Sequence, residues 1–116
     1  MRTMFLLAAV FGTATVPHAG LKSSSPAKGS TVIAPKEISL TFTEGVNLLA
    51  TSIAILKADS TLVEKLHVRF TAGDTTVAGP VTRPLPPGTY LIKWRNGSAD
   101  DGHVSSGTFS FHVVGH

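Results

Sequence analysis

The sequence predicts an all-β protein, an antiparallel Greek-key sandwich or barrel of about seven strands. Three observations predict this class. Short segments with alternating apolar and polar residues recur along the chain, turn-forming residues separate them, and no segment keeps a helical period beyond a turn or two. With 116 residues, 11 of them Gly and 7 Pro, the chain has room for one domain. An immunoglobulin-like arrangement is the commonest solution at this length, and a cupredoxin-like topology is the alternative.

The first clear strand is expected at residues 36–43. Ile38, Leu40 and Phe42 alternate there with polar residues, and a period of two places all three on one buried face. A second apolar run follows at 52–57. These two segments are predicted to be half-buried strands of the sandwich.

The middle of the chain predicts a third strand, a turn and an edge piece. Apolar and polar residues alternate through 62–70, and the sequence Ala72-Gly73-Asp74 then interrupts the pattern. A short piece at 75–78 is expected to pair at a sheet edge. The four prolines within 80–87 keep the next stretch out of a central sheet position.

Two strongly alternating segments complete the predicted sandwich. Pro87-Gly88 indicates a turn, and the strand expected at 89–95 carries Trp94 on its inward face. The last strand is expected at 108–114, with three apolar residues inward and serine and histidine outward. No internal repeat, low-complexity tract or second domain is evident in the sequence.

The N-terminal segment has the order of a secretory signal peptide. Arg2 precedes an apolar run from Met4 to Phe11, and small and polar residues follow. The run is far shorter than the roughly 20 residues that span a bilayer, so we expect export without a permanent membrane anchor. Thr15, His18 and Gly20 compete as the first residue of the mature chain, and cleavage rules alone would not select His18.

The composition excludes several classes of function. The chain has no cysteine, which removes disulfides, thiolate metal sites and a cysteine nucleophile, and limits any metal site to nitrogen and oxygen ligands. Its charged fraction of 15% and hydrophobic fraction of 42% indicate a folded protein. The ten basic residues are scattered, so we expect no nucleic-acid partner.

The most informative short motif is Asp101-Gly102-His103, in the connection before the last strand. Residues two apart point to the same side of an extended chain, so this carboxylate and imidazole can meet one metal ion or each other. Taken alone, the spacing more often marks a local hydrogen-bonded turn than a pair of ligands.

Ordered motifs cover nearly the whole chain from His18 onward. They are His18-Ala19-Gly20-Leu21, Ser25-Pro26-Ala27-Lys28-Gly29-Ser30, Ile38-Ser39-Leu40-Thr41-Phe42-Thr43-Glu44, Tyr90-Leu91-Ile92-Lys93-Trp94-Arg95, Ser98-Ala99-Asp100-Asp101-Gly102-His103 and Ser106-Gly107-Thr108-Phe109-Ser110-Phe111. In this order they resemble the CopC family of periplasmic copper-resistance proteins, as far as about Val114.

The resemblance implies a metal site for one Cu(II) ion per chain. If His18 is the N-terminus, its α-amine and ring Nδ1 chelate copper, and the His103 imidazole completes a three-nitrogen histidine brace, which suits the tetragonal preference of Cu(II). Asp101 is the implied nearby carboxylate, as an axial ligand or a partner of the amine. This chain has one aspartate more than the family motif, so Asp100 is the alternative. Glu44 is a secondary candidate, since the family's glutamate approaches copper in some members.

The resemblance also implies a domain organisation and a role. Residues 1–17 are expected to be a cleaved signal peptide and residues 18–116 one copper-binding domain. We expect a periplasmic monomer that is not an enzyme and that carries or buffers Cu(II) in copper resistance. The family's usual partner resembles an inner-membrane copper permease. Two rival functions are a copper monooxygenase, which uses the same brace, and a metal-free sandwich module for adhesion or assembly.

The remaining histidines and methionines are interpreted conservatively. His67 and His112 are expected on outward strand faces, and His116 in the tail. Met1 and Met4, both in the leader, are the only methionines. A thioether site for Cu(I), which some family members have, is therefore not expected in the mature chain.

Overall fold

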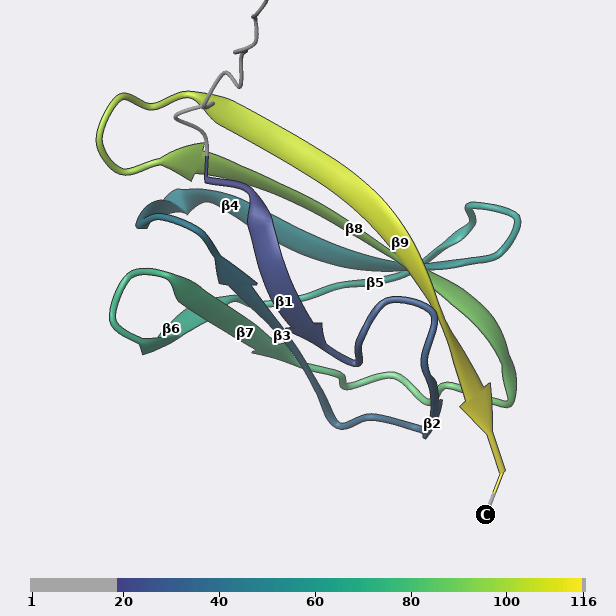
Figure 1. Ribbon diagram of the computed structural model, residues 1–116. Coiled ribbons are helices and arrows are strands. Elements are labelled where there is room, and N and C mark those ends of the chain that lie inside the picture. The colour runs from purple at the N-terminus through teal and green to yellow at the C-terminus, as the bar shows by residue number, and fades with distance from the viewer. Residues whose placement is uncertain (1–18, 116) are drawn as a thin grey trace, which may run out of the picture.

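A computed structural model describes residues 19–115, which form a sandwich of two β-sheets and contain no helix. Figure 1 shows the two sheets facing each other. The four-stranded sheet has the order β1 (Leu21–Ser25), β3 (Glu37–Phe42), β7 (Thr76–Pro80) and β6 (Arg69–Ala72), and the five-stranded sheet has the order β2 (Thr31–Ile33), β9 (Val104–Val114), β8 (Gly88–Ser98), β4 (Val46–Lys57) and β5 (Leu62–Lys65). In the range that the structure describes, no helix is long and apolar enough to cross a membrane.

The chain alternates between hairpins and crossings from one sheet to the other. β4–β5, β6–β7 and β8–β9 are antiparallel hairpins, while the chain changes sheet after β1, β2, β3, β5 and β7. The predicted sandwich class is confirmed. One strand pair departs from the antiparallel expectation, because the three-residue β2 runs parallel to the end of β9.

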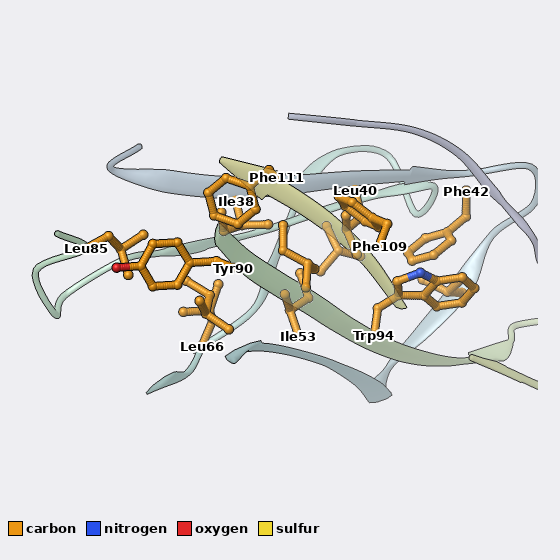
Figure 2. Close-up of a cluster of buried hydrophobic side chains, with 14 of the residues drawn as sticks. Ile38, Leu40, Phe42, Ile53, Leu66, Leu85, Tyr90, Trp94, Phe109 and Phe111 are labelled. Atoms are coloured by element: carbon orange, nitrogen blue, oxygen red, sulfur yellow. The ribbon is translucent and has the colours of Figure 1, made fainter. Parts of the chain in front are cut away.

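The core lies between the sheets and is built from the inward faces of the long strands. Ile38, Leu40 and Phe42 of β3 are at most 1% exposed, as their alternation predicts. The aromatic side chains of β8 and β9 lie across from them (Figure 2). The ring of Trp94 is 5.4 Å from that of Phe42, measured between centroids, and a second aromatic pair stacks at 5.8 Å toward the other end of β8.

The predicted third strand is wrong in one respect: residues 62–70 form two strands in different sheets. β5 pairs with β4, and β6 pairs with β7. The crossing occurs around Leu66, whose side chain is buried and whose backbone N–H donates to the carbonyl of Ile53. His67 therefore lies, exposed, in a connection and not on a strand. The alternation persists through the crossing, so the pattern alone does not reveal it.

Two edge strands carry too little apolar pattern to be predicted. β1 is Leu-Lys-Ser-Ser-Ser and β2 has three residues. Tertiary pairing creates both of them, β1 against β3 and β2 against β9. Because β1 pairs Leu21 with Phe42, it brings the start of the described chain to the end of β3.

The proline-containing connection between β7 and β8 is fastened to β5. The Glu64 carboxylate accepts the backbone N–H of Thr82 at 2.9 Å and that of Arg83 at 3.0 Å, and it also accepts the Thr82 hydroxyl. Burial alone would raise the pKa of Glu64, but these hydrogen bonds outweigh it and hold the pKa below its usual range. Pro84, Pro86 and Pro87 lie outside both sheets, as predicted, but Pro80 is the last residue of β7. The expectation of an edge strand at 75–78 is wrong, because β7 lies between β3 and β6.

Candidate metal centre

One end of the sandwich collects the residues that the sequence singles out. Three connections meet there: 43–45 between β3 and β4, 73–75 between β6 and β7, and 99–103 between β8 and β9. The described chain also begins at this end, with β1. Figure 1 shows these segments together at the left of the molecule.

The connection between β8 and β9 is a compact hairpin loop. The backbone N–H of Ser98 donates to the carbonyl of His103 at 2.9 Å, and that of Gly102 donates to the carbonyl of Ser98 at 2.9 Å. Gly102 has a positive φ of 71°, a conformation that glycine adopts without a steric penalty. The loop therefore holds His103 at its base, exposed to solvent.

Asp101 connects directly to His103 through the backbone. Its Oδ1 accepts the His103 backbone N–H at 2.9 Å. This hydrogen bond is the main reason that the pKa of Asp101 is lowered, and the nearby imidazole of His103 lowers it further. The carboxylate is thus ionised at neutral pH, and its charge lies next to the histidine.

Asp100 has a different environment. It is exposed, and its backbone N–H donates to the Ser98 hydroxyl at 3.3 Å. Of the two neighbouring aspartates, Asp101 is the one whose carboxylate turns back toward His103. Both predicted carboxylates therefore lie in the loop, and it is that of Asp101 that accepts the His103 backbone N–H.

Glu44 lies between the start of β1 and the hairpin loop. On one side, the Thr43 N–H donates to the Gly20 carbonyl at 2.8 Å and the Gly20 N–H donates to the Thr43 hydroxyl at 3.1 Å. On the other side, the Gly45 carbonyl accepts the Ala99 N–H at 3.0 Å. The residues on either side of the half-buried Glu44 are therefore hydrogen-bonded to the two segments that the sequence predicts to supply copper ligands.

A further carboxylate, Asp74, reaches this end and is missed by the sequence interpretation. Its backbone carbonyl accepts the Val46 N–H at 2.9 Å, and its side chain lies against Gly45, where an added Cβ would be 2.2 Å from Oδ2. The sequence shows Asp74 only as part of a turn. The strand pairing that brings this turn to Gly45 is needed to find it.

The three connections carry charge of one sign. Four of the seven acidic residues lie in the three connections, and these connections contain neither lysine nor arginine: the acidic residues are Glu44, Asp74, Asp100 and Asp101. The three connections therefore carry a net negative charge.

The predicted ligand His18 lies outside the described residues, but Ala19, which follows it, is fully buried at this end. The Ala19 carbonyl accepts a hydrogen bond from Nδ2 of Asn96 at 3.0 Å. Asn96 continues the inward face of β8 beyond Trp94. Sequence analysis missed it because the predicted strand stopped at residue 95.

The other histidines lie away from this loop. His67 is exposed in the connection between β5 and β6. Nδ1 of His112, in β9, is 2.9 Å from the Thr89 hydroxyl, while His116 is outside the described residues. Within residues 19–115, no three histidine, aspartate or glutamate side chains are grouped closely enough to hold a metal ion.

Comparison with known proteins gives consistent matches. The CopC domain profile matches residues 21–114. Copper resistance protein C of Escherichia coli is 33% identical over 103 residues, which cover 83% of this chain and 81% of the relative. The crystal structure of CopC from Methylosinus trichosporium OB3b is similar with a TM-score of 0.78 and 32% identity, over 85% of this chain and 96% of that one. PcoC, described as a methionine-rich copper resistance protein from Escherichia coli, has a TM-score of 0.67 and 28% identity, over 84% and 99% of the two chains.

Proposed function

This chain belongs to the CopC family, and on that premise we propose that it binds Cu(II) as a periplasmic carrier or buffer in copper resistance. The observation that carries the proposal is the meeting of two segments at one end of the sandwich. The buried start of the described chain and the His103 loop both reach the connection that contains Glu44. Cu(II) accepts nitrogen and oxygen ligands, and these are the ligand types that a chain without cysteine provides.

The proposed site is a histidine brace with one Cu(II) ion. His18 supplies its α-amine and ring Nδ1, and His103 supplies the second imidazole. Asp101 is the adjacent carboxylate, with Asp100 as the alternative and Glu44 as a secondary candidate. The α-amine has an ordinary pKa of about 7.7–8.0 and must lose a proton to bind, so copper binding releases protons and weakens in acid.

The brace requires a particular mature chain. We propose that residues 1–17 are a signal peptide and that cleavage leaves His18 as the first residue of a single domain, 18–116. Support comes from Ala19, the second residue of the proposed mature chain, which is buried in the core of the domain. Intact mass spectrometry of the exported protein, with and without copper, measures the cleavage site and the stoichiometry together.

The oxidation state follows from the ligands that this chain has. The structurally similar PcoC is described as methionine-rich, whereas this chain has methionine only at positions 1 and 4. Cu(I) selection in a cysteine-free protein depends mainly on thioether sulfur. We therefore propose a Cu(II) site without a second, soft site.

A carrier explains these features better than an oxidase built on the same brace. A carboxylate beside the copper tends to fill the position that oxygen would need, and Asp101 is held within the same loop as His103. A carrier needs no turnover. Sustained oxidation of a polysaccharide by the copper-loaded protein would place it among the enzymes instead.

The decisive test compares a blocked N-terminus with substitutions of two histidines. Adding one residue before His18 removes the free amine from the chelate, and His103→Ala removes the second imidazole, so each change should abolish tight Cu(II) binding. His67→Ala is the matched control, because His67 is also exposed but lies outside the proposed site. Isothermal titration and electron paramagnetic resonance measure affinity and ligation. Tight binding that survives the terminal block would exclude the brace.

A further inference from the structure

Asn96 is a polar residue in a position where the fold expects an apolar one. It follows Ile92 and Trp94 on the inward face of β8 and is 0% exposed. Its Nδ2 donates to the Ala19 carbonyl at 3.0 Å. Its Oδ1 is the one buried side-chain polar atom for which residues 19–115 provide no hydrogen-bond partner.

The orientation of this amide follows from its partner. A carbonyl can only accept, so the atom facing Ala19 must be the amide nitrogen and not the oxygen. Oδ1 is thereby left in the buried environment next to the start of the chain. A buried acceptor without a partner destabilises a fold, and buried polar groups in native proteins nearly always have one. The missing donor is therefore to be sought among the groups that adjoin Ala19.

We propose that Asn96 is a positioning residue for the N-terminal copper ligand, in an inference that rests on the proposed function. Nδ2 fixes the Ala19 carbonyl, and Oδ1 accepts an N–H from residue 18, which in the processed protein is the α-amine. A copper-bound amine keeps N–H groups and so can donate to Oδ1 while it ligates the metal. Asn96 does not touch the ion; it acts through the position of His18.

The surrounding contacts make this tie effective. The N–H and the carbonyl of Gly20 both form hydrogen bonds with Thr43. The Ala19 carbonyl accepts one from Asn96. Two consecutive residues are therefore fixed to the sandwich. Residue 18 is joined directly to Ala19 by a peptide bond, so fixing Ala19 restricts where the α-amine can lie. A terminus held in this way loses less conformational freedom when the metal binds, and that increases affinity through preorganisation.

The test replaces the amide with side chains that cannot make these bonds. Asn96→Val introduces an apolar side chain that favours strands, and the smaller Asn96→Ala guards against a clash. In either variant, Cu(II) affinity should fall at least about fivefold to tenfold, as expected for the loss of the hydrogen bond between Oδ1 and the amine. The Cu(II) resonance spectrum should also change, and the amide of Gly20 in the metal-free protein should exchange faster with solvent. The variants should also be less stable than wild type, because the buried Ala19 carbonyl loses its donor.

Tyr90→Phe is the matched control on the same strand. It also removes one hydrogen bond from a buried inward side chain to a backbone carbonyl, that of Pro86 at 2.5 Å, but at the far end of β8. It should leave copper affinity and spectrum unchanged.

The two proposals fail in different ways. If the Asn96 variants bind copper with wild-type affinity and spectrum, or if they lose stability with no change in the copper site, the positioning role is refuted. If His103→Ala keeps tight binding, the brace itself is wrong, whatever Asn96 does.

Discussion

Gly107→Ala should destabilise the protein by wedging a methyl group under Trp94. Gly107 in β9 lies directly opposite Trp94 in β8. A Cβ added to Gly107 would lie 2.7 Å from Cζ2 of the indole and 2.9 Å from Cε2 and Nε1, and carbon atoms in van der Waals contact are about 3.5–4.0 Å apart. The indole has little room to retreat, since it is 7% exposed and packs against Phe42.

The magnitude follows from the cost of overpacking. Inserting one methyl group into a close-packed core typically costs about 1–3 kcal/mol. For a domain of this size, each kcal/mol lowers the melting temperature by about 4–8 °C. Urea unfolding followed by fluorescence measures the effect directly, because Trp94 is the only tryptophan. Its emission should also shift in the native state as the ring is displaced.

Gly115→Ala is the control for the general effect of replacing glycine. Within residues 19–115, no heavy atom outside the adjoining residues lies within 4 Å of a Cβ at that position. The stability of Gly115→Ala should therefore remain within about 0.5 kcal/mol of wild type. The reasoning about Trp94 would be refuted if Gly107→Ala matched this control in stability and left the tryptophan emission unchanged.

Three further predictions concern the loop, the metal and pH. Asp101→Asn should perturb the Cu(II) resonance spectrum more than Asp100→Asn, since Asp101 is the carboxylate bonded to the His103 backbone; the reverse order would assign the site to Asp100. Reduced copper should be lost readily to a Cu(I) chelator, with little peroxide formed from ascorbate and oxygen, and strong retention would reveal a Cu(I) site among the surface histidines. Because its hydrogen bonds lower the pKa of Glu64, they stabilise the fold above its unfolded pKa of about 4.3, and the contribution is lost as pH falls through the lower folded value. Glu64→Gln should therefore be less stable than wild type in urea at pH 6, and the difference should vanish near pH 3; an equal difference at both pH values would contradict this linkage.

The fold class could be predicted because the core strands carry their own pattern. Ile38, Leu40 and Phe42 alternate in the sequence and are buried in the structure. The crossing at Leu66 could not be predicted, because a strand that leaves one sheet and joins the other can keep the same alternation of apolar and polar residues. β1 and β2 depend on their neighbours for pairing, and a local pattern cannot express that dependence.

The candidate site divides in the same way. The residues in the hairpin loop could be identified because they lie within a few positions of one another in the sequence and form one short motif. Asp74 and Asn96 could not, since their importance arises from contacts with Gly45 and Ala19, which are distant in the sequence. A polar residue at an inward strand position is the one local feature that could have drawn attention to Asn96, provided that the strand had been extended beyond Arg95.

The loop geometry bears on two interpretations of Asp101 and His103 that the sequence leaves as alternatives, a hydrogen-bonded turn and a pair of metal ligands. The turn is present, with Oδ1 of Asp101 accepting the backbone N–H two residues later. That bond uses the main chain of His103 and leaves its imidazole outside the turn. It also occupies one carboxylate oxygen of Asp101, while Oδ2 is not part of the bond. The spacing of two residues that forms the turn also keeps this carboxylate and the imidazole in one loop, so the turn is compatible with metal binding.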